Sequence, residues 1–357
     1  MASTDKTIIR EIGSSAYHDP VYFCQTFLPH IFEEPLPWIH RGLLYYLLGK
    51  GNTEFGSCLL NDPEKEIIIE HFVDQKGEPV FHRGYNEPAS KVLIMLPGGF
   101  AKTTFAGLVL PLYFTLYHET GFLAYVGSTP GDGRSQVENV RNELEGNERI
   151  TAVFGQNKGD KWTGNAITTA SGIAMSSRGY GHQETIEKVR GMTHAGKKPG
   201  ILIADGLTTR SNSVTDKQRQ EVQGWFYSEV IPAVSAQGRL IYFDTLKHAD
   251  SLPEHIANDP AWTVIRLSSL DKRGVATWPL VATEAAIAAQ RKSYAMGNQL
   301  HIFNMEYFNE PTAEDSTGLL AEMELERNEF LSLVEPYADT AFKSFVESRA
   351  AEMRDIE

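Results

Sequence analysis

The 357-residue chain has only two cysteines, Cys24 and Cys58, which are too few for a disulfide framework or a four-cysteine zinc site. It contains no apolar run of membrane-spanning length, and its first residues lack the shape of a signal peptide. Internal repeats, low-complexity tracts and zinc-type clusters of histidine and cysteine are also missing. We therefore expect a soluble protein of a reducing, intracellular compartment that does not associate with membranes.

Positive charge is also scarce, because 33 lysines and arginines face 46 aspartates and glutamates, for a net charge of −13. This balance excludes a generally basic surface for nucleic acid. A local basic strip such as Lys197-Lys198 is still compatible with such contact. The length allows one large α/β domain, or one domain with appendages.

The most informative stretch is a short apolar run, residues 93–96, that leads through a glycine-rich turn to Lys102 and an apolar helix. Backbone N–H groups of such a turn, together with the positive end of the helix, bind phosphate. Lys102 would contact the β- and γ-phosphates, and the Thr103 hydroxyl would bind Mg²⁺. Ala101 stands where the usual phosphate loop has its second glycine. An ordinary tight turn before a buried helix is the alternative.

Three further buried strands are predicted, at residues 121–129, 200–205 and 239–243. Their alternation with helices predicts a largely parallel sheet, with ligands at the carboxyl ends of the strands. Asp205 ends one strand, where a Walker B acid would hold Mg²⁺, or where it would only cap the next loop. Residues 244–248 follow the strand at 239–243, and they would either sense the γ-phosphate or only end that strand.

Other segments carry weaker signals. Residues 1–55 are predicted to be helical, and the pair His40-Arg41 opens a helix that would either stack on adenine or only pack. Arg178 and Arg190 lie beside glycines, which suits either a close approach to phosphate or an ordinary surface loop. The remaining expectations are a β-hairpin from residues 66–73 and 79–82, a short β unit at 162–175, a helix at 284–294, an extended segment at 303–311 and a helical, acidic tail at 319–357.

In their order and spacing, these segments resemble the ATPase part of the large terminase subunit of tailed bacteriophages, a DNA-packaging motor. The resemblance extends from about residue 36 to residue 311, and each segment is short: 37–41, 97–104, 143–147, 154–155, 189–191, 201–205, 225–227, 245–252 and 306–311.

The resemblance implies an α/β P-loop NTPase fold of the additional-strand type, with a mainly parallel sheet flanked by helices and a small lid. The domains would be a helical segment at 1–60, an ATPase core at 61–255, a lid or linker subdomain at 256–325 and a helical tail at 326–357. The family usually continues into a nuclease domain. We expect none in this chain, and therefore no DNA cleavage by it.

The resemblance also implies roles for individual residues. Nucleotide would be bound by His40, Arg41, Pro97, Gly98, Gly99, Phe100, Ala101, Lys102, Thr103 and Thr104. Lys102 and Asp205 would be catalytic, with Thr103 and Asp205 on Mg²⁺. Thr245 and His248 would couple hydrolysis to movement, and Arg178 or Arg190 would serve as an arginine finger or phosphate sensor.

Two positions depart from the family pattern inside this site. Gly98 stands where the family commonly has an arginine, so one phosphate-binding cation is missing. Gly206 stands where the family has a second carboxylate, which orients the attacking water. Asp244, at the next strand end, is the candidate to replace that carboxylate.

The function expected from this resemblance is an ATPase, with ATP and Mg²⁺, that drives double-stranded DNA into a procapsid in the host cytoplasm. Its partners would be the portal protein, the small terminase subunit and further copies of itself in a ring. The alternative is a ring module that binds ATP, with portal or DNA, but turns over little. A helicase would need a second RecA-like domain and a kinase an arginine-rich lid, and the sequence offers neither.

Overall fold

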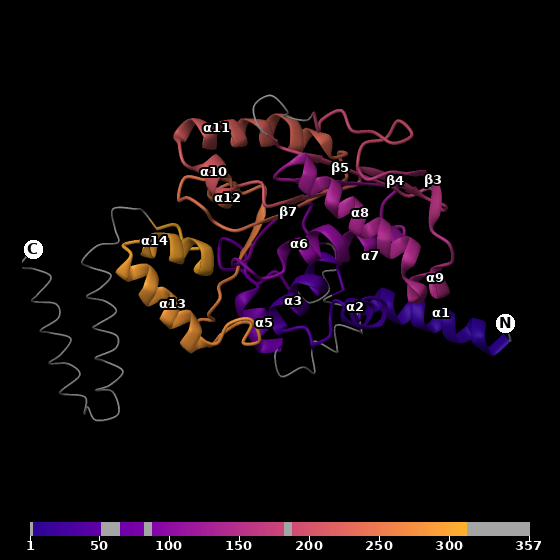
Figure 1. Ribbon diagram of the computed structural model, residues 1–357, viewed down its shortest axis with the longest axis horizontal. Helices are drawn as coiled ribbons and strands as arrows, with labels where there is room; N and C mark the ends of the chain where they lie inside the picture. The colour runs from indigo at the N-terminus through magenta and orange to yellow at the C-terminus, as the bar shows by residue number, and fades with distance from the viewer. Residues whose placement is uncertain (1–2, 51–64, 82–87, 182–187, 313–357) are drawn as a thin grey trace, which may run out of the picture.

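The computed structural model describes residues 3–50, 65–81, 88–181 and 188–312 (Figure 1). Its centre is a sheet with the strand order β3-β4-β5-β2-β6-β7-β1-β8. The strands are β1 (Lys91–Met95), β2 (Phe122–Gly127), β3 (Lys158–Trp162), β4 (Ala166–Thr169), β5 (Ala174–Gly179), β6 (Ile201–Asp205), β7 (Arg239–Asp244) and β8 (Thr263–Arg266).

The sheet is parallel in the order β5-β2-β6-β7-β1-β8, whereas the pairs β3–β4 and β4–β5 are antiparallel. β7 lies between β1, which leads into the glycine-rich turn, and β6, which ends on Asp205. This order confirms the predicted mainly parallel sheet and its additional strand. The carboxyl ends of β1, β2, β6 and β7 consequently meet at one edge.

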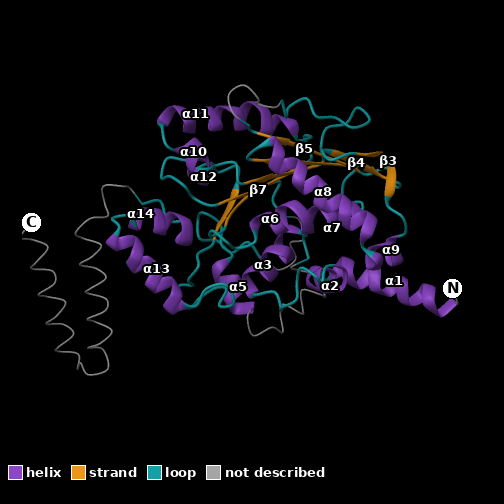
Figure 2. Cartoon of the chain, viewed as in Figure 1, coloured by secondary structure: helices purple, strands orange, loops and turns teal. Residues whose placement is uncertain are grey.

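Alternate residues of each strand face opposite sides of the sheet, and both sides are buried. Ile94 and Phe243 belong to one hydrophobic cluster, whereas Leu93 and Tyr242 belong to the other. Helices cover both faces (Figure 2). Burial on both sides explains why these strands are continuous apolar runs rather than alternating ones.

The first face is covered by the N-terminal helices and by the helices that follow β1 and β2. They are α1 (Ser3–His18), α2 (Pro20–Phe27), α3 (Trp38–Leu47), α5 (Lys65–His71), α6 (Lys102–Thr104), α7 (Leu110–Leu116), α8 (Pro130–Gly146) and α9 (Glu148–Phe154). The second face is covered chiefly by α11 (Asp216–Trp225), which follows the short α10 (Arg210–Ser213), and by α12 (Leu252–Ala257).

A third, small cluster lies outside the sheet, in α13 (Glu284–Met296) and α14 (Leu300–Phe303), toward one end of the molecule (Figure 1). Its buried apolar residues are Ala276, Ile287, Leu300 and Phe303. We call residues 276–308 the small subdomain. The sheet itself extends beyond residue 255, because β8 pairs with β1.

Two secondary-structure predictions are wrong. Residues 65–71 form helix α5 rather than a strand, because Ile68 and Phe72, four residues apart, pack against Gly42 of α3. Residues 303–308 are helical rather than extended, and the rings of Phe303 and Tyr307 stack at 4.5 Å. The predicted turn at 74–78 is present, closed by a bridge between Val73 and Pro79.

Most other predicted elements are confirmed. The N-terminal helices, the β unit before residue 175 and the helix from Glu284 are all found. The tail at 319–357 lies outside the described residues. In the part of the chain that the structure describes, no helix has the length and apolar character needed to cross a membrane.

Candidate nucleotide site at the carboxyl edge of the sheet

The glycine-rich turn joins β1 to α6 with two residues in left-handed backbone conformations. Gly99 has φ 78°, and Ala101 has φ 50° and ψ 25°. Glycine adopts such angles at little cost, whereas an alanine is strained there. Ala101 therefore has the conformation expected of the glycine that the usual phosphate loop carries at this position.

The side chain of Lys102 folds back over this turn. Its Nζ donates to the carbonyl oxygens of Leu96 at 3.2 Å and Pro97 at 2.7 Å. Burial lowers the pKa of Lys102 to about 8, although the nearby carboxylates of Asp244 and Asp205 act to raise it. The ammonium group thus lies inside the loop, where a phosphate held by the backbone N–H groups would meet it.

Thr103 and Asp205, which are far apart in the sequence, lie close together in the fold. Asp205 is buried, and its Oδ2 accepts from the Tyr125 hydroxyl at 2.9 Å. Burial raises the pKa of Asp205, and the nearby hydroxyls of Thr103 and Tyr125 oppose the rise. A threonine hydroxyl and a carboxylate are hard oxygen ligands, which fit Mg²⁺.

The described residues contain no group of three or more histidine, cysteine or acidic side chains that could hold a metal.

Asp244 ends β7 and is almost fully buried. Its Oδ2 accepts from the Thr208 amide at 3.0 Å, from the Thr208 hydroxyl at 2.8 Å and from the Tyr242 hydroxyl. Its Oδ1 accepts from the Thr245 amide at 2.7 Å. Burial raises the pKa of Asp244 in spite of these donors. Both oxygens are therefore engaged in holding the loops after β6 and β7.

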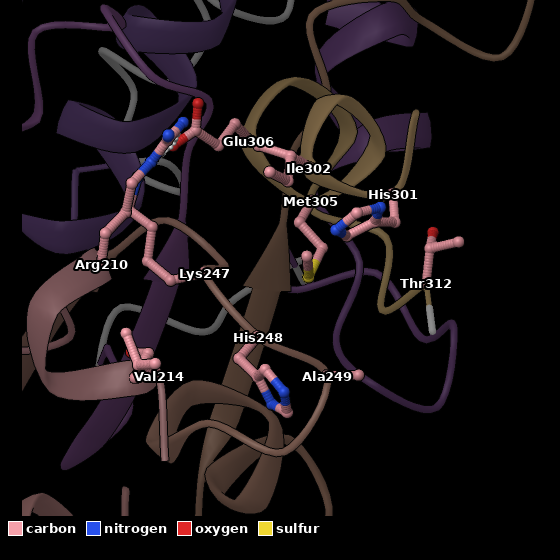
Figure 3. A pocket seen from close by; sticks show the side chains of 11 residues that line it. Arg210, Val214, Lys247, His248, Ala249, His301, Ile302, Met305, Glu306 and Thr312 are labelled. Carbon is pink, nitrogen blue, oxygen red and sulfur yellow. Dashed lines mark hydrogen bonds and ion pairs between the residues drawn. The ribbon is translucent and has the colours of Figure 1, made fainter. Parts of the chain in front are cut away.

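The segment after β7 contacts the glycine-rich turn directly. The Thr245 hydroxyl donates to Leu96 O at 2.6 Å, which is the same oxygen that Lys102 Nζ contacts. His248 lies farther along, where its Nδ1 accepts from the Asp250 amide at 2.9 Å. Thr245 is thus placed against the loop, whereas His248 lines a neighbouring cavity of about 400 Å³ (Figure 3).

Glu306, from the small subdomain, meets the loop from the other side. Its carbonyl oxygen accepts from the Gly98 amide at 2.9 Å. Its Oε1 lies 3.1 Å from Lys247 Nζ and 2.9 Å from an Arg210 nitrogen, so both cations meet at one carboxylate (Figure 3). Lys247 belongs to the strand-end segment 244–248, which was expected either to sense the γ-phosphate or only to end the strand. Glu306 lies in a segment on which the resemblance rests, and the sequence gave no role to Arg210.

Gly206 follows Asp205 with φ 58°, and its amide donates to Phe243 O at 2.8 Å. A side chain at this position would meet open space, but it would have to adopt a left-handed backbone.

His40 does not lie in an open adenine site. It is 0% exposed, its ring stacks on Phe105 at 4.8 Å and meets Trp278 edge-on, and its Nε2 contacts Phe100 O at 3.2 Å. Burial lowers the pKa of His40 to about 4. The alternative of a packing helix is therefore correct for His40, which supports the loop from behind. The neighbouring Arg41 is half-buried.

The two candidate arginine fingers are placed differently. Arg178 belongs to strand β5 rather than to a loop, and its guanidinium donates to Ser177 O at 2.7 Å. Arg190 is exposed, and its backbone amide donates to Glu229 at 3.1 Å. An arginine finger acts on the nucleotide of a neighbouring subunit, so this role stays a prediction for both residues.

No family model matches the chain, and no curated protein matches it. Among solved structures, it is similar to the large terminase ATPase domain of Thermus phage P74-26, with 14% identity, a TM-score of 0.41, and coverage of 73% of this chain and 98% of that one. It is also similar to the large terminase of a second thermophilic bacteriophage, in complex with ADP, with 11% identity, a TM-score of 0.35, and coverage of 61% and 48%. Both are phage large terminases.

Proposed function

We propose that this chain is a P-loop ATPase domain of the large-terminase kind, which binds Mg-ATP at the carboxyl edge of the sheet. One observation carries the proposal. Lys102, Thr103 and Asp205 lie together, because the Lys102 charge and the Thr103 hydroxyl both act on the Asp205 carboxyl and lower its pKa. These are the three side chains that phosphate-loop chemistry requires; Lys102 and Thr103 are in α6, which follows β1, and Asp205 ends β6, with β7 between the two strands.

Each residue has a separate task in this proposal. The N–H groups of the turn and of α6 would hold phosphate oxygens, and Lys102 would neutralise charge on them. Thr103 and Asp205 would hold Mg²⁺, which when bound offsets the negative charge of the phosphates. Thr245 would register a change at the phosphates, because its hydroxyl shares an acceptor with Lys102.

The site has fewer of the groups needed for ATP hydrolysis than of those needed for ATP binding. Hydrolysis needs a group that orients water against the γ-phosphate, and Gly206 has no side chain to do so. Asp244 already accepts from Thr208, Tyr242 and Thr245. Because neither residue is available to orient water, we expect slow hydrolysis by the isolated domain. The same reason supports the second candidate function, an ATP-binding ring module with little turnover.

The partners follow from the proposed motor function. They are double-stranded DNA, the portal protein, a small terminase subunit and further copies of this chain in a ring. With a net charge of −13, we expect one copy to bind DNA weakly and with a steep dependence on salt.

The experiment is a calorimetric titration with Mg-ATP. Lys102→Ala is expected to abolish measurable binding, because a charge-assisted phosphate contact contributes roughly 1.5–3 kcal/mol. Lys217→Ala is the matched control, since Lys217 is an exposed lysine of α11. Equal affinity of the Lys102→Ala variant and the unaltered chain would refute the phosphate-loop assignment.

A further inference from the structure

We propose that Lys247 replaces the cation missing at position 98, and that Glu306 holds it away from the nucleotide until a γ-phosphate arrives. The proposal rests on the proposed function and names a further phosphate-binding residue for it. Lys247 is the donor, the γ-phosphate is its target, and Glu306 is the competing acceptor.

Two contacts made by neighbours of Lys247 place it close to the glycine-rich turn. Lys247 follows Thr245 by two residues, and the Thr245 hydroxyl is bonded to Leu96 O beside Lys102 Nζ. Its partner Glu306 is bonded through its carbonyl to the Gly98 amide. Glu306 therefore contacts both Gly98, through its carbonyl oxygen, and Lys247, through its carboxylate.

The charges around this pair favour a move of Lys247 from Glu306 to the γ-phosphate. Lys247 and Glu306 are only 20% and 16% exposed, so water screens their attraction poorly. Burial acts to raise the pKa of Glu306, but Lys247 and Arg210 outweigh it and hold that pKa below its ordinary value. Glu306 therefore stays ionised, and it keeps Arg210 as a partner if Lys247 leaves.

The side chains have room to rearrange. The cavity of about 400 Å³ beside the pair is lined by Lys247, His248, His301 and Glu306 (Figure 3). Lys247 also lies near Lys102, whose pKa its charge helps to lower. Two ammonium groups held close together repel each other, and an entering triphosphate would relieve that repulsion.

The discriminating experiment compares Mg-ATP with Mg-ADP, because only ATP has the γ-phosphate. Lys247→Met is expected to weaken ATP binding by about tenfold or more, and ADP binding much less. Lys247→Arg should restore most of the affinity for ATP. Lys217→Met, which removes an exposed lysine paired with Glu221, is the matched control and should change neither affinity.

The variant Glu306→Gln is expected to change the affinity for ATP in the opposite direction. Removing the competing carboxylate should strengthen ATP binding, and this gain should vanish in the Lys247→Met background. If the ion pair were only structural, Lys247→Met and Glu306→Gln would change affinity in the same direction, and the proposal would be overturned. An unchanged ATP-to-ADP affinity ratio in Lys247→Met would also overturn it.

The outcomes separate this proposal from the function on which it rests. Loss of binding in Lys102→Ala, together with an unaffected ratio in Lys247→Met, would leave the nucleotide site standing and remove Lys247 from it. Failure of the unaltered chain to bind Mg-ATP would overturn both.

Discussion

The carboxyl edge of the sheet and the small subdomain meet at the same loop, yet they are built very differently. At the sheet edge, strands buried on both faces end on Asp205 and Asp244, and their carboxylates are held by several donors. The small subdomain has only four buried apolar residues in its own cluster, and it reaches the loop through Glu306 and through the ring of Trp278, which meets Phe100.

The side chains at the sheet edge are held rigidly, whereas the contact of the small subdomain with the loop can change. Side chains at the ends of buried parallel strands inherit their positions from the packed core, which tolerates little displacement. The contacts of Glu306, two ion pairs and one backbone hydrogen bond, are worth only about a few kcal/mol, so a ligand that competes for one of these partners can displace it. The sheet edge suits phosphate and metal binding, and the small subdomain suits a response to them.

The largest expected effect comes from replacing one buried phenylalanine by alanine in each region, the central sheet and the small subdomain. Phe243→Ala, in β7, should lower the free energy of unfolding by about 3–5 kcal/mol in a urea titration. Phe303→Ala, in the small cluster, should speed hydrogen exchange in residues 284–308 and leave the exchange of β1, β6 and β7 unchanged.

Both phenylalanines are 0% exposed, so the contrast tests the surrounding core and not the burial of the side chain. Equal acceleration of exchange in the sheet strands by Phe303→Ala would show that the two regions unfold as one unit, and the comparison would fail.

The next effect concerns turnover at the sheet edge. Gly206→Asp should raise the rate of ATP hydrolysis by about 10²-fold, the lower end of what a positioned acid or base contributes. Aspartate suits the test better than glutamate, because position 206 has φ 58° and aspartate tolerates left-handed backbone comparatively well. Steady-state release of phosphate measures the rate.

Gly206→Asn is the matched control, since asparagine has the same shape and the same tolerance of left-handed backbone. Equal rates for the Asp and Asn variants would exclude a missing carboxylate as the cause of slow turnover. Brisk hydrolysis by the unaltered chain that survives Asp244→Asn would mean that another group orients the water.

A smaller effect concerns the pH dependence of Mg-ATP binding. Lys102 in the nucleotide-free loop has a pKa of about 8, lowered by burial. Above that pH it is mostly neutral and must take up a proton to pair with phosphate, so affinity should fall by up to about tenfold per pH unit. Calorimetry from about pH 7 to 9.5, which brackets this pKa, measures the slope. The Lys102→Arg variant stays charged, so its affinity for Mg-ATP should not fall over this pH range. An equal slope in that variant would contradict the assignment of the pH dependence to Lys102.

The smallest effect concerns strain in the loop itself. Ala101→Gly should stabilise the protein by about 0.5–1 kcal/mol, because the relief of the left-handed backbone exceeds the extra entropy of glycine in the unfolded chain. Ala106→Gly, a few residues later in the helix, should instead destabilise it by about 1 kcal/mol. A urea titration of both variants checks the two signs. Destabilisation by Ala101→Gly would mean that the loop is not strained.

The sequence alone determined the elements whose signals are local. The apolar runs that became β1, β2, β6 and β7 are continuous because both faces of the sheet are buried, and that pattern needs no knowledge of neighbours. The same runs indicated which polar residues would follow a strand, so Lys102, Thr103 and Asp205 could be predicted to share one edge. The capping box of Thr215 and Gln218, which begins α11, is likewise formed by residues close together in the sequence.

The tertiary structure alone decided what depends on packing between distant segments. Residues 65–71 have strand-forming isoleucines, yet contact with α3 makes them helical. His40 has the chemistry of a base-stacking ring, yet Phe105 and Trp278 enclose it in the core. Glu306 lies far from Gly98 in the sequence, and no local pattern could show that its carbonyl and carboxylate would meet the loop and Lys247. Such contacts arise only when the chain closes long loops around a common core, which is why sequence periodicity cannot reveal them.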